Sequence, residues 1–212
     1  MERNSVFRDR REAGQLLSEA LTEFKDTRET VVIGIPRGGV VVAYEISKRL
    51  KLPLDVVVVK KLGYPGNPEL ALGAAGEASY YLNEDLSRSV PKNYIEEEVK
   101  RKQAEAHERV LDLRGSRKAL DLRGKTVILV DDGIATGASM RMAIMVVKSL
   151  NPTRIVVATP VAPPDAVKTL EEVADKVVTL MRPVSFYAIG QFYRDFSEVS
   201  IEDVKKLMVE EM

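Results

Sequence analysis

Two adjacent carboxylates, Asp131 and Asp132, stand between an apolar run and a glycine-containing loop in the stretch VILVDDGIATGASM at 127–140. Carboxylates accept strong hydrogen bonds from sugar hydroxyls, and they stabilise positive charge that develops when the bond at an anomeric carbon breaks. The loop that follows offers backbone N–H groups and the hydroxyls of Thr136 and Ser139 at the start of a helix, which is typical of a phosphate site. The stretch therefore predicts a site for a sugar phosphate.

Two further polar segments are predicted to lie close to the acidic pair. The turn 36–39 and the pair Lys60 and Lys61 each follow an apolar, β-branched run. Ligands of an open α/β sheet bind beyond the carboxyl ends of its strands, so these segments should surround one crevice. A Walker A loop is excluded because Val40 stands where its lysine is required, and the chain has no GxGxxG motif.

The elements that position these residues alternate between strand and helix patterns. Such alternation predicts an α/β fold, a parallel sheet of about five strands with helices on both faces. The predicted strands are 30–36, 52–63, 125–132, 153–162 and 175–181, and the predicted helices are 6–24, 38–50, 138–150 and 164–174.

One connection is much longer than a crossover requires. Residues 62–124 separate the second strand from the third. The first half has Gly and Pro at turn spacing, which favours a mobile loop with a short hairpin, and the second half, from residue 91, favours a charged helix. We expect residues 63–120 to form a lid or an oligomer contact within a single domain spanning 1–212.

The composition of the 212 residues limits the function classes. Apolar residues make up 45% and charged residues 30%, a globular balance, and 32 basic residues offset 32 acidic ones. This charge balance disfavours nucleic acid as a partner, unless a dimer assembles a basic face from Arg101, Lys102, Arg109, Arg114, Arg117 and Lys118. The absence of cysteine, of an apolar leader and of any long apolar run predicts a cytoplasmic protein with no membrane contact.

The stretch 127–139 resembles the phosphoribosyl pyrophosphate (PRPP) signature of the type I phosphoribosyltransferases. The resemblance covers most of the chain. GIPRGG at 34–39 looks like that family's pyrophosphate loop, VVKKLG at 58–63 is similar to the basic segment leading into its lid, and FYAIGQFYRDF at 186–196 looks like part of its hood, placed here at 181–200.

The resemblance implies a role for each matching residue. Asp131 and Asp132 would be the catalytic residues, holding the ribose hydroxyls directly or through Mg²⁺. A ring nitrogen of a base would displace pyrophosphate from PRPP. The resemblance also implies a homodimer, the usual assembly of the family. The implied 5′-phosphate residues are Gly133, Ile134, Ala135, Thr136, Gly137, Ala138 and Ser139; the implied pyrophosphate residues are Arg37, Gly38, Gly39, Lys60 and Lys61; and the implied base-binding residues are Phe186 and Tyr187.

Three departures from the family pattern leave the acceptor base open. Ala135 stands where some purine-specific members have an aspartate, Ser185 precedes Phe186 where the 6-oxopurine enzymes have an acid, and only Arg182 is available near the fifth strand for a purine carbonyl. Several matching residues also have plainer structural interpretations: the acids as a helix cap, the lysines as a solvated strand end and the aromatic pair as hood packing. The alternative function is a regulatory protein that binds PRPP or a nucleotide without transferring it.

Overall fold

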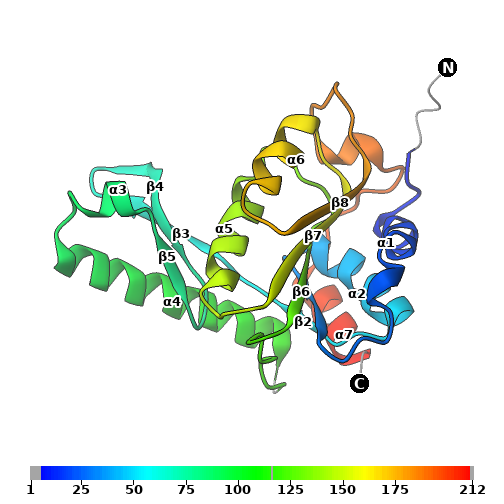
Figure 1. The fold of residues 1–212 in the computed structure, drawn as a ribbon, viewed down its shortest axis with the longest axis horizontal. Helices are drawn as coiled ribbons and strands as arrows, with labels where there is room; N and C mark the ends of the chain where they lie inside the picture. Colours follow the sequence, from blue (N-terminus) through cyan, green and yellow to red (C-terminus); the bar gives the residue numbers. More distant parts are fainter. Residues whose placement is uncertain (1–5, 116, 211–212) are drawn as a thin grey trace.

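The computed structural model describes residues 6–115 and 117–210. Five parallel strands form the central sheet in the order β2-β1-β6-β7-β8 (Figure 1). This arrangement confirms the predicted α/β fold. The strands are β1 (Thr30–Gly34), β2 (Leu54–Val56), β6 (Thr126–Val130), β7 (Arg154–Val161) and β8 (Lys176–Met181).

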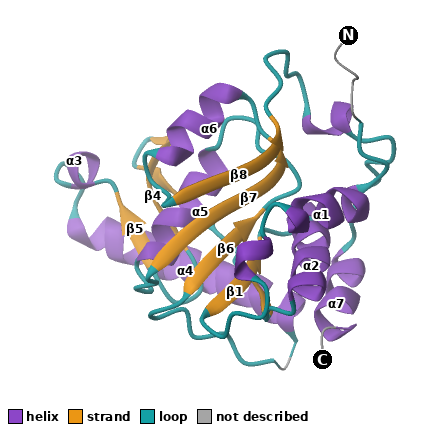
Figure 2. Cartoon of the chain, turned by 45° about the vertical axis from the view of Figure 1, so that its right-hand side comes forward, coloured by secondary structure: helices purple, strands orange, loops and turns teal. Residues whose placement is uncertain are grey.

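Helices cover both faces of the sheet (Figure 2), because successive strand residues point to opposite sides. Val32 packs with α1 (Arg10–Glu19), α2 (Gly38–Leu50) and α7 (Ile201–Glu210), while its neighbour Val31 packs with α5 (Ala138–Lys148) and α6 (Pro164–Glu171). The four helices predicted from the sequence are present, although α1 begins only at Arg10. Asp9 sets that start, because its side chain accepts a hydrogen bond from the N–H of Glu12 at 2.8 Å; the end of the predicted segment is a short 3₁₀ turn, Thr22–Phe24.

The predicted strand 52–63 is wrong as a single element. The chain leaves the central sheet after Val56, and β3 (Lys60–Tyr64) pairs instead with β4 (Asn67–Ala75), which pairs with β5 (Tyr80–Leu82). These three strands form a separate antiparallel sheet. The continuous valine run gives no sign of this change of sheet, since every residue in it suits a buried strand.

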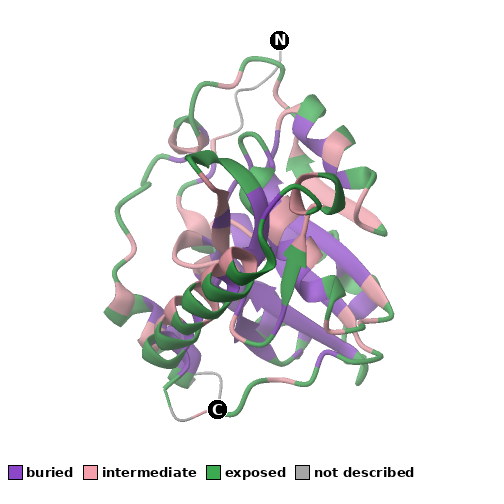
Figure 3. Ribbon diagram, turned by 90° about the vertical axis from the view of Figure 1, so that its left-hand side faces the viewer, coloured by how far each residue is buried: buried purple, intermediate pink, exposed green. Residues whose placement is uncertain are grey.

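The insertion is therefore more regular than a loop with a short hairpin. Its sheet is followed by the short helix α3 (Glu84–Ser87) and the 23-residue helix α4 (Lys92–Arg114), and both project from the body on the left of Figure 1. The insertion has a small apolar cluster of its own, which includes Leu62, Leu72 and Val99. Figure 3 views it end-on: the front of the molecule is largely exposed, with the buried sheet behind it.

The far half of α4 joins the main core. Ala106, Val110 and Leu113 pack in the same cluster as α2 and α7. At the other side, the turn between β4 and β5 rests on α5: the hydroxyl of Ser79 donates to the carbonyl of Val146 at 2.8 Å, and a Cβ on Gly76 would lie 2.7 Å from Val146 Cγ1. The base of the insertion is thus fixed to the body at two places.

Two features near the C-terminus were not predicted. Helix α7 follows the hood and buries Val204, Leu207 and Met208 in the core. The hood itself contains a 3₁₀ turn, Ile189–Phe192, after which Tyr193 forms an isolated parallel bridge with Phe7. In the part of the chain that the structure describes, no helix has the length and apolar character needed to cross a membrane.

Candidate functional site

The acidic pair lies at the tip of β6, in the middle of the sheet. Oδ1 of Asp131 accepts a hydrogen bond from the N–H of Asp132 at 2.8 Å. Burial, and secondarily the neighbouring Asp132 carboxylate, raises the pKa of Asp131 well above its ordinary value. A carboxyl group with a raised pKa at the end of a central strand is a feature of functional sites more often than of inert surface.

Asp132 differs from its neighbour because it has a cationic partner. Nε of Arg10 lies 2.6 Å from Oδ2 of Asp132, and both side chains are 11% exposed. Arg10 is held in turn by the Phe196 ring, whose centre is 3.8 Å from the guanidinium carbon, and by the carbonyl of Ser197 at 2.8 Å. The start of α1 and the hood therefore meet at the second carboxylate.

Tyr193 adds a second link between the hood and the acidic pair. Its hydroxyl donates to the main-chain carbonyl of Asp132 at 2.5 Å. Burial, followed by the charge of Asp132, raises the pKa of Tyr193, so the phenol stays protonated as a donor. Sequence reasoning missed Arg10 and assigned no role to Tyr193, because both contacts join segments far apart in the chain and no local spacing marks them.

Much of the loop after the acids lies at the surface, as expected of an anion site. Ala135, Thr136, Ala138 and Ser139 are exposed, and Gly137 has a positive φ of 80° as it enters α5. Gly133 is covered by the hood, where a Cβ would collide with Cγ2 of Ile189. Ile134 is buried and its N–H donates to the Val161 carbonyl, so it anchors the loop.

The turn after β1 packs directly against the acidic pair. A Cβ on Gly38 would collide with Oδ2 of Asp132, and one on Gly39 would lie 2.7 Å from the carbonyl oxygen of Val130. Only glycine fits at either position. The peptide bond between Pro36 and Arg37 is cis, and Nη2 of Arg37 pairs with Oε1 of Glu198 at 2.7 Å.

Lys60 and Lys61 are adjacent in β3, so their side chains point to opposite faces of the strand. Lys60 lines a cavity of about 310 Å³ together with Arg37 and Ser139. Lys61 is not among the residues lining this cavity and pairs with the carboxylate of Glu69 at 3.2 Å. The structure thus places Lys60 beside Arg37 and Ser139 in a cavity that neither Asp131 nor Asp132 lines, and it leaves Lys61 outside this cavity.

The two aromatic residues predicted to bind a base also separate. Phe186 is partly buried and packs against Phe192, with ring centres 5.3 Å apart. Tyr187 is 89% exposed. Phe186 is therefore a packed residue of the hood, and Tyr187 lies at the surface of the same loop.

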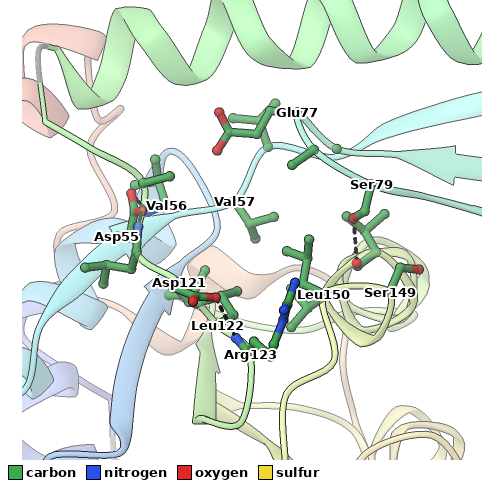
Figure 4. A pocket seen from close by; sticks show the side chains of 18 of the residues that line it. Asp55, Val56, Val57, Glu77, Ser79, Asp121, Leu122, Arg123, Ser149 and Leu150 are labelled. Atoms are coloured by element: carbon green, nitrogen blue, oxygen red, sulfur yellow. Dashed lines mark hydrogen bonds between the residues drawn. The ribbon is translucent and has the colours of Figure 1, made fainter.

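A second cavity, of about 220 Å³, lies beside the edge strand β2 (Figure 4). Three of its charged groups satisfy one another: Arg114 donates to Asp55 at 2.8 Å and to Glu77 at 2.6 Å, and Asp55 also accepts from the N–H of Leu120. These bonds connect α4, β2 and the β4–β5 turn. We interpret this cavity as part of the joint between the insertion and the body.

The domain family described as the phosphoribosyl transferase domain matches residues 8–197. The chain belongs to the phosphoribosyl transferase family.

Individual relatives of this phosphoribosyl transferase family member are similar over nearly the whole chain. The crystal structure of TT1426 from Thermus thermophilus is 48% identical, covers 97% of this chain and 98% of its own, and superposes with a TM-score of 0.88. Two proteins from Mycobacterium tuberculosis strains CDC 1551 and H37Rv, both named "Putative phosphoribosyl transferase", are 42% identical over 202 residues, which is 94% of this chain. The alignment spans about 45% of the length of those two relatives.

Proposed function

We propose that this protein transfers the ribose 5-phosphate of PRPP to a ring nitrogen of a purine or pyrimidine base, with release of pyrophosphate. The observation that carries the proposal is the position of three groups at one edge of the sheet: the acidic pair, the exposed loop residues at the start of α5, and a cavity with Arg37 and Lys60. A ribose with a phosphate at one end and a pyrophosphate at the other needs these three kinds of partner.

In this mechanism Asp131 and Asp132 accept hydrogen bonds from the ribose hydroxyls. As the anomeric bond to pyrophosphate lengthens, positive charge develops on the sugar, and the carboxylates stabilise that charge more than they stabilise the ground state. Arg10 holds Asp132 in position through its 2.6 Å ion pair. The loop 133–139 binds the 5′-phosphate through main-chain N–H groups and the hydroxyls of Thr136 and Ser139.

Mg²⁺ fits this site as an ion that is bound jointly by the substrate phosphates and the protein. No group of three or more acidic or histidine side chains suited to a metal exists among the described residues, so the protein offers no complete cage. Mg²⁺ commonly binds through one or two carboxylates together with substrate phosphates, and Asp131 and Asp132 supply carboxylates of this kind. When bound, the ion would neutralise part of the pyrophosphate charge.

The regulatory alternative remains as the second candidate, although three of the six cations of its basic face are closely paired with acids. Arg101 pairs with Glu98 at 2.7 Å, Lys102 with Glu105 at 3.0 Å, and Arg114 is buried between two acids. These side chains are already neutralised by their neighbours. We therefore propose that small molecules are the partners, in a cytoplasmic homodimer consisting of single-domain chains; light scattering of the purified chain tests the dimer.

The test of the proposed function is pyrophosphate release. The protein is incubated with PRPP, Mg²⁺ and each of a panel of purine and pyrimidine bases, and a base-dependent release of pyrophosphate is expected. Binding of PRPP with no release for any base would favour the regulatory candidate. Absence of binding to PRPP and to every nucleoside monophosphate would remove both. A nucleotide that co-purifies with the protein would name the base directly.

A further inference from the structure

The cavity beside the turn after β1 is strongly cationic in a chain of zero formal net charge. Three cations line it, Arg37, Lys60 and Arg109, and none of the described residues that line it is acidic. Ser139 adds a hydroxyl, and the remaining lining residues are apolar. Arg37 is paired with Glu198 outside the lining, and Glu105 interacts electrostatically with Lys60, so part of this charge is already balanced. A concave site lined by cations still favours a compact, multiply charged anion.

Arg109 is the unexpected member of this group, because it belongs to α4 in the insertion. It lies in the charged run that the sequence marks as a surface helix. Its position in the cavity comes from the packing of the far half of α4 on the core, where Ala106, Val110 and Leu113 are buried. The side chain of Arg109 remains 36% exposed, so it is open to a ligand from the cavity.

The ion pairs on α4 leave Arg109 weakly partnered. Its nearest carboxylate is Asp112, with Nη1 and Oδ2 separated by 3.6 Å, whereas Nζ of Lys205 lies only 2.7 Å from Oδ1 of the same residue. By contrast, Arg101 on the same helix makes contacts of 2.7 Å and 3.1 Å with Glu98 and Glu105. Lys60 makes no ion pair with any residue that the structure describes. Two of the three cavity cations are thus available for an anion.

We propose that Arg109 is a further pyrophosphate-binding residue, so that the insertion helix completes the leaving-group site together with Lys60. This inference rests on the proposed function and adds a residue to it. Arg109 would form charge-assisted hydrogen bonds to pyrophosphate oxygens, for which a guanidinium is well suited because its planar fork can contact two oxygens. These bonds strengthen as negative charge accumulates on the departing group, so Arg109 would act on the transition state as well as on binding.

The experiment separates pyrophosphate from the other half of the substrate. Calorimetric titrations with magnesium pyrophosphate and, separately, with ribose 5-phosphate are made on the wild type, Arg109→Ala, Arg109→Lys and Arg101→Ala. We expect Arg109→Ala to weaken pyrophosphate binding about 10- to 100-fold, the loss typical of one charge-assisted contact, and to leave ribose 5-phosphate binding unchanged. Arg109→Lys should lie between this variant and the wild type, and Arg101→Ala should match the wild type.

Three other outcomes would overturn the inference in distinguishable ways. If Arg109→Ala binds pyrophosphate as the wild type does, Arg109 has no part in the site, while the proposed function stands. If Arg109→Ala weakens both ligands equally, the residue acts through the fold. If the wild type binds neither pyrophosphate, ribose 5-phosphate nor PRPP, the proposed function fails and the inference fails with it.

Discussion

The central sheet and the insertion are stabilised in different ways, and the contrast shows where each contributes to the site. Two apolar layers enclose the five parallel strands, so the tip of β6 that carries Asp131 and Asp132 is held by a rigid core. The insertion has only a small apolar cluster of its own. Its attachment depends on α4 and on the buried bonds of Arg114 to Asp55 and Glu77. We infer that the core supplies the groups that act on the sugar, and the insertion supplies charge for the leaving group.

The largest expected effect tests the core. Replacing both acids, Asp131→Asn with Asp132→Asn, should lower kcat/KM about 10³-fold, equivalent to about 4 kcal/mol of transition-state stabilisation. The far-ultraviolet circular dichroism should remain that of a folded protein. Asp165→Asn, at an exposed position on α6, is the matched control and should leave kcat/KM unchanged. An active double variant would remove the catalytic role of the strand tip.

The next effect tests how the insertion is attached. Arg114→Ala leaves the carboxylates of Asp55 and Glu77 without their guanidinium partner, and Asp55 is only 4% exposed. Breaking a buried ion pair from one side should lower the free energy of unfolding by about 3 kcal/mol, measured by urea denaturation. Arg101→Ala, on the exposed face of the same helix, should change it by less than about 0.5 kcal/mol. Equal effects of the two substitutions would contradict the assigned joint.

A smaller effect distinguishes the two faces of β3. Lys60→Ala should raise the KM for PRPP about tenfold, because it removes a cation from the cavity. Lys61→Ala should leave the KM within about twofold of the wild type, since its partner is the exposed Glu69. Steady-state kinetics on the two single variants measures both values. If Lys61 has the larger effect, the cavity assignment is wrong.

The smallest expected effect is on Tm, where Asp131 and Asp132 should contribute differently to stability as the pH changes. Because the pKa of Asp131 is raised, the folded state binds its proton more tightly than the unfolded state does, and this residue lowers stability as pH rises through the interval between the two pKa values. Asp131→Asn should therefore raise Tm at neutral pH by about 2–4 °C for each kcal/mol relieved. The gain should vanish towards about pH 4, the ordinary carboxyl pKa.

Asp132→Asn should instead lower Tm at neutral pH, because it removes the ion pair with Arg10. Calorimetric scans at several pH values compare the two variants directly. Shifts in Tm of the same sign for both substitutions would contradict the different electrostatic surroundings described for the pair.

Sequence reasoning was successful where burial leaves a repetitive pattern. Strands such as Thr126–Val130 and the helix Gly38–Leu50 were predicted with their approximate bounds, because apolar runs and helical spacing follow directly from a covered parallel sheet. Helix α7 also has such a pattern, with Ile201, Val204 and Leu207, and its sequence signal was overlooked.

Other features depend on contacts that no local pattern records. The change of sheet after Val56 is set by what the chain packs against, and the run of valines at 56–59 continues across it without a break. Arg10 reaches Asp132 across 122 residues of sequence, and Arg109 reaches its cavity only because α4 docks on the body. The acidic pair and the loop proposed to bind phosphate stand out in the sequence because all their members are consecutive.

The contact of Ser79 and Gly76 with Val146 has a consequence for how the molecule moves. Helix α5 begins at the loop proposed to bind the phosphate, and its other end contacts the β4–β5 turn. The same helix therefore connects the proposed phosphate site to the insertion. A rigid movement of the whole insertion would have to displace α5 as well, and this would disturb the loop proposed to bind the phosphate. We therefore expect any movement of the insertion to be confined to the outer β3–β4 hairpin, while the β4–β5 turn stays in contact with α5.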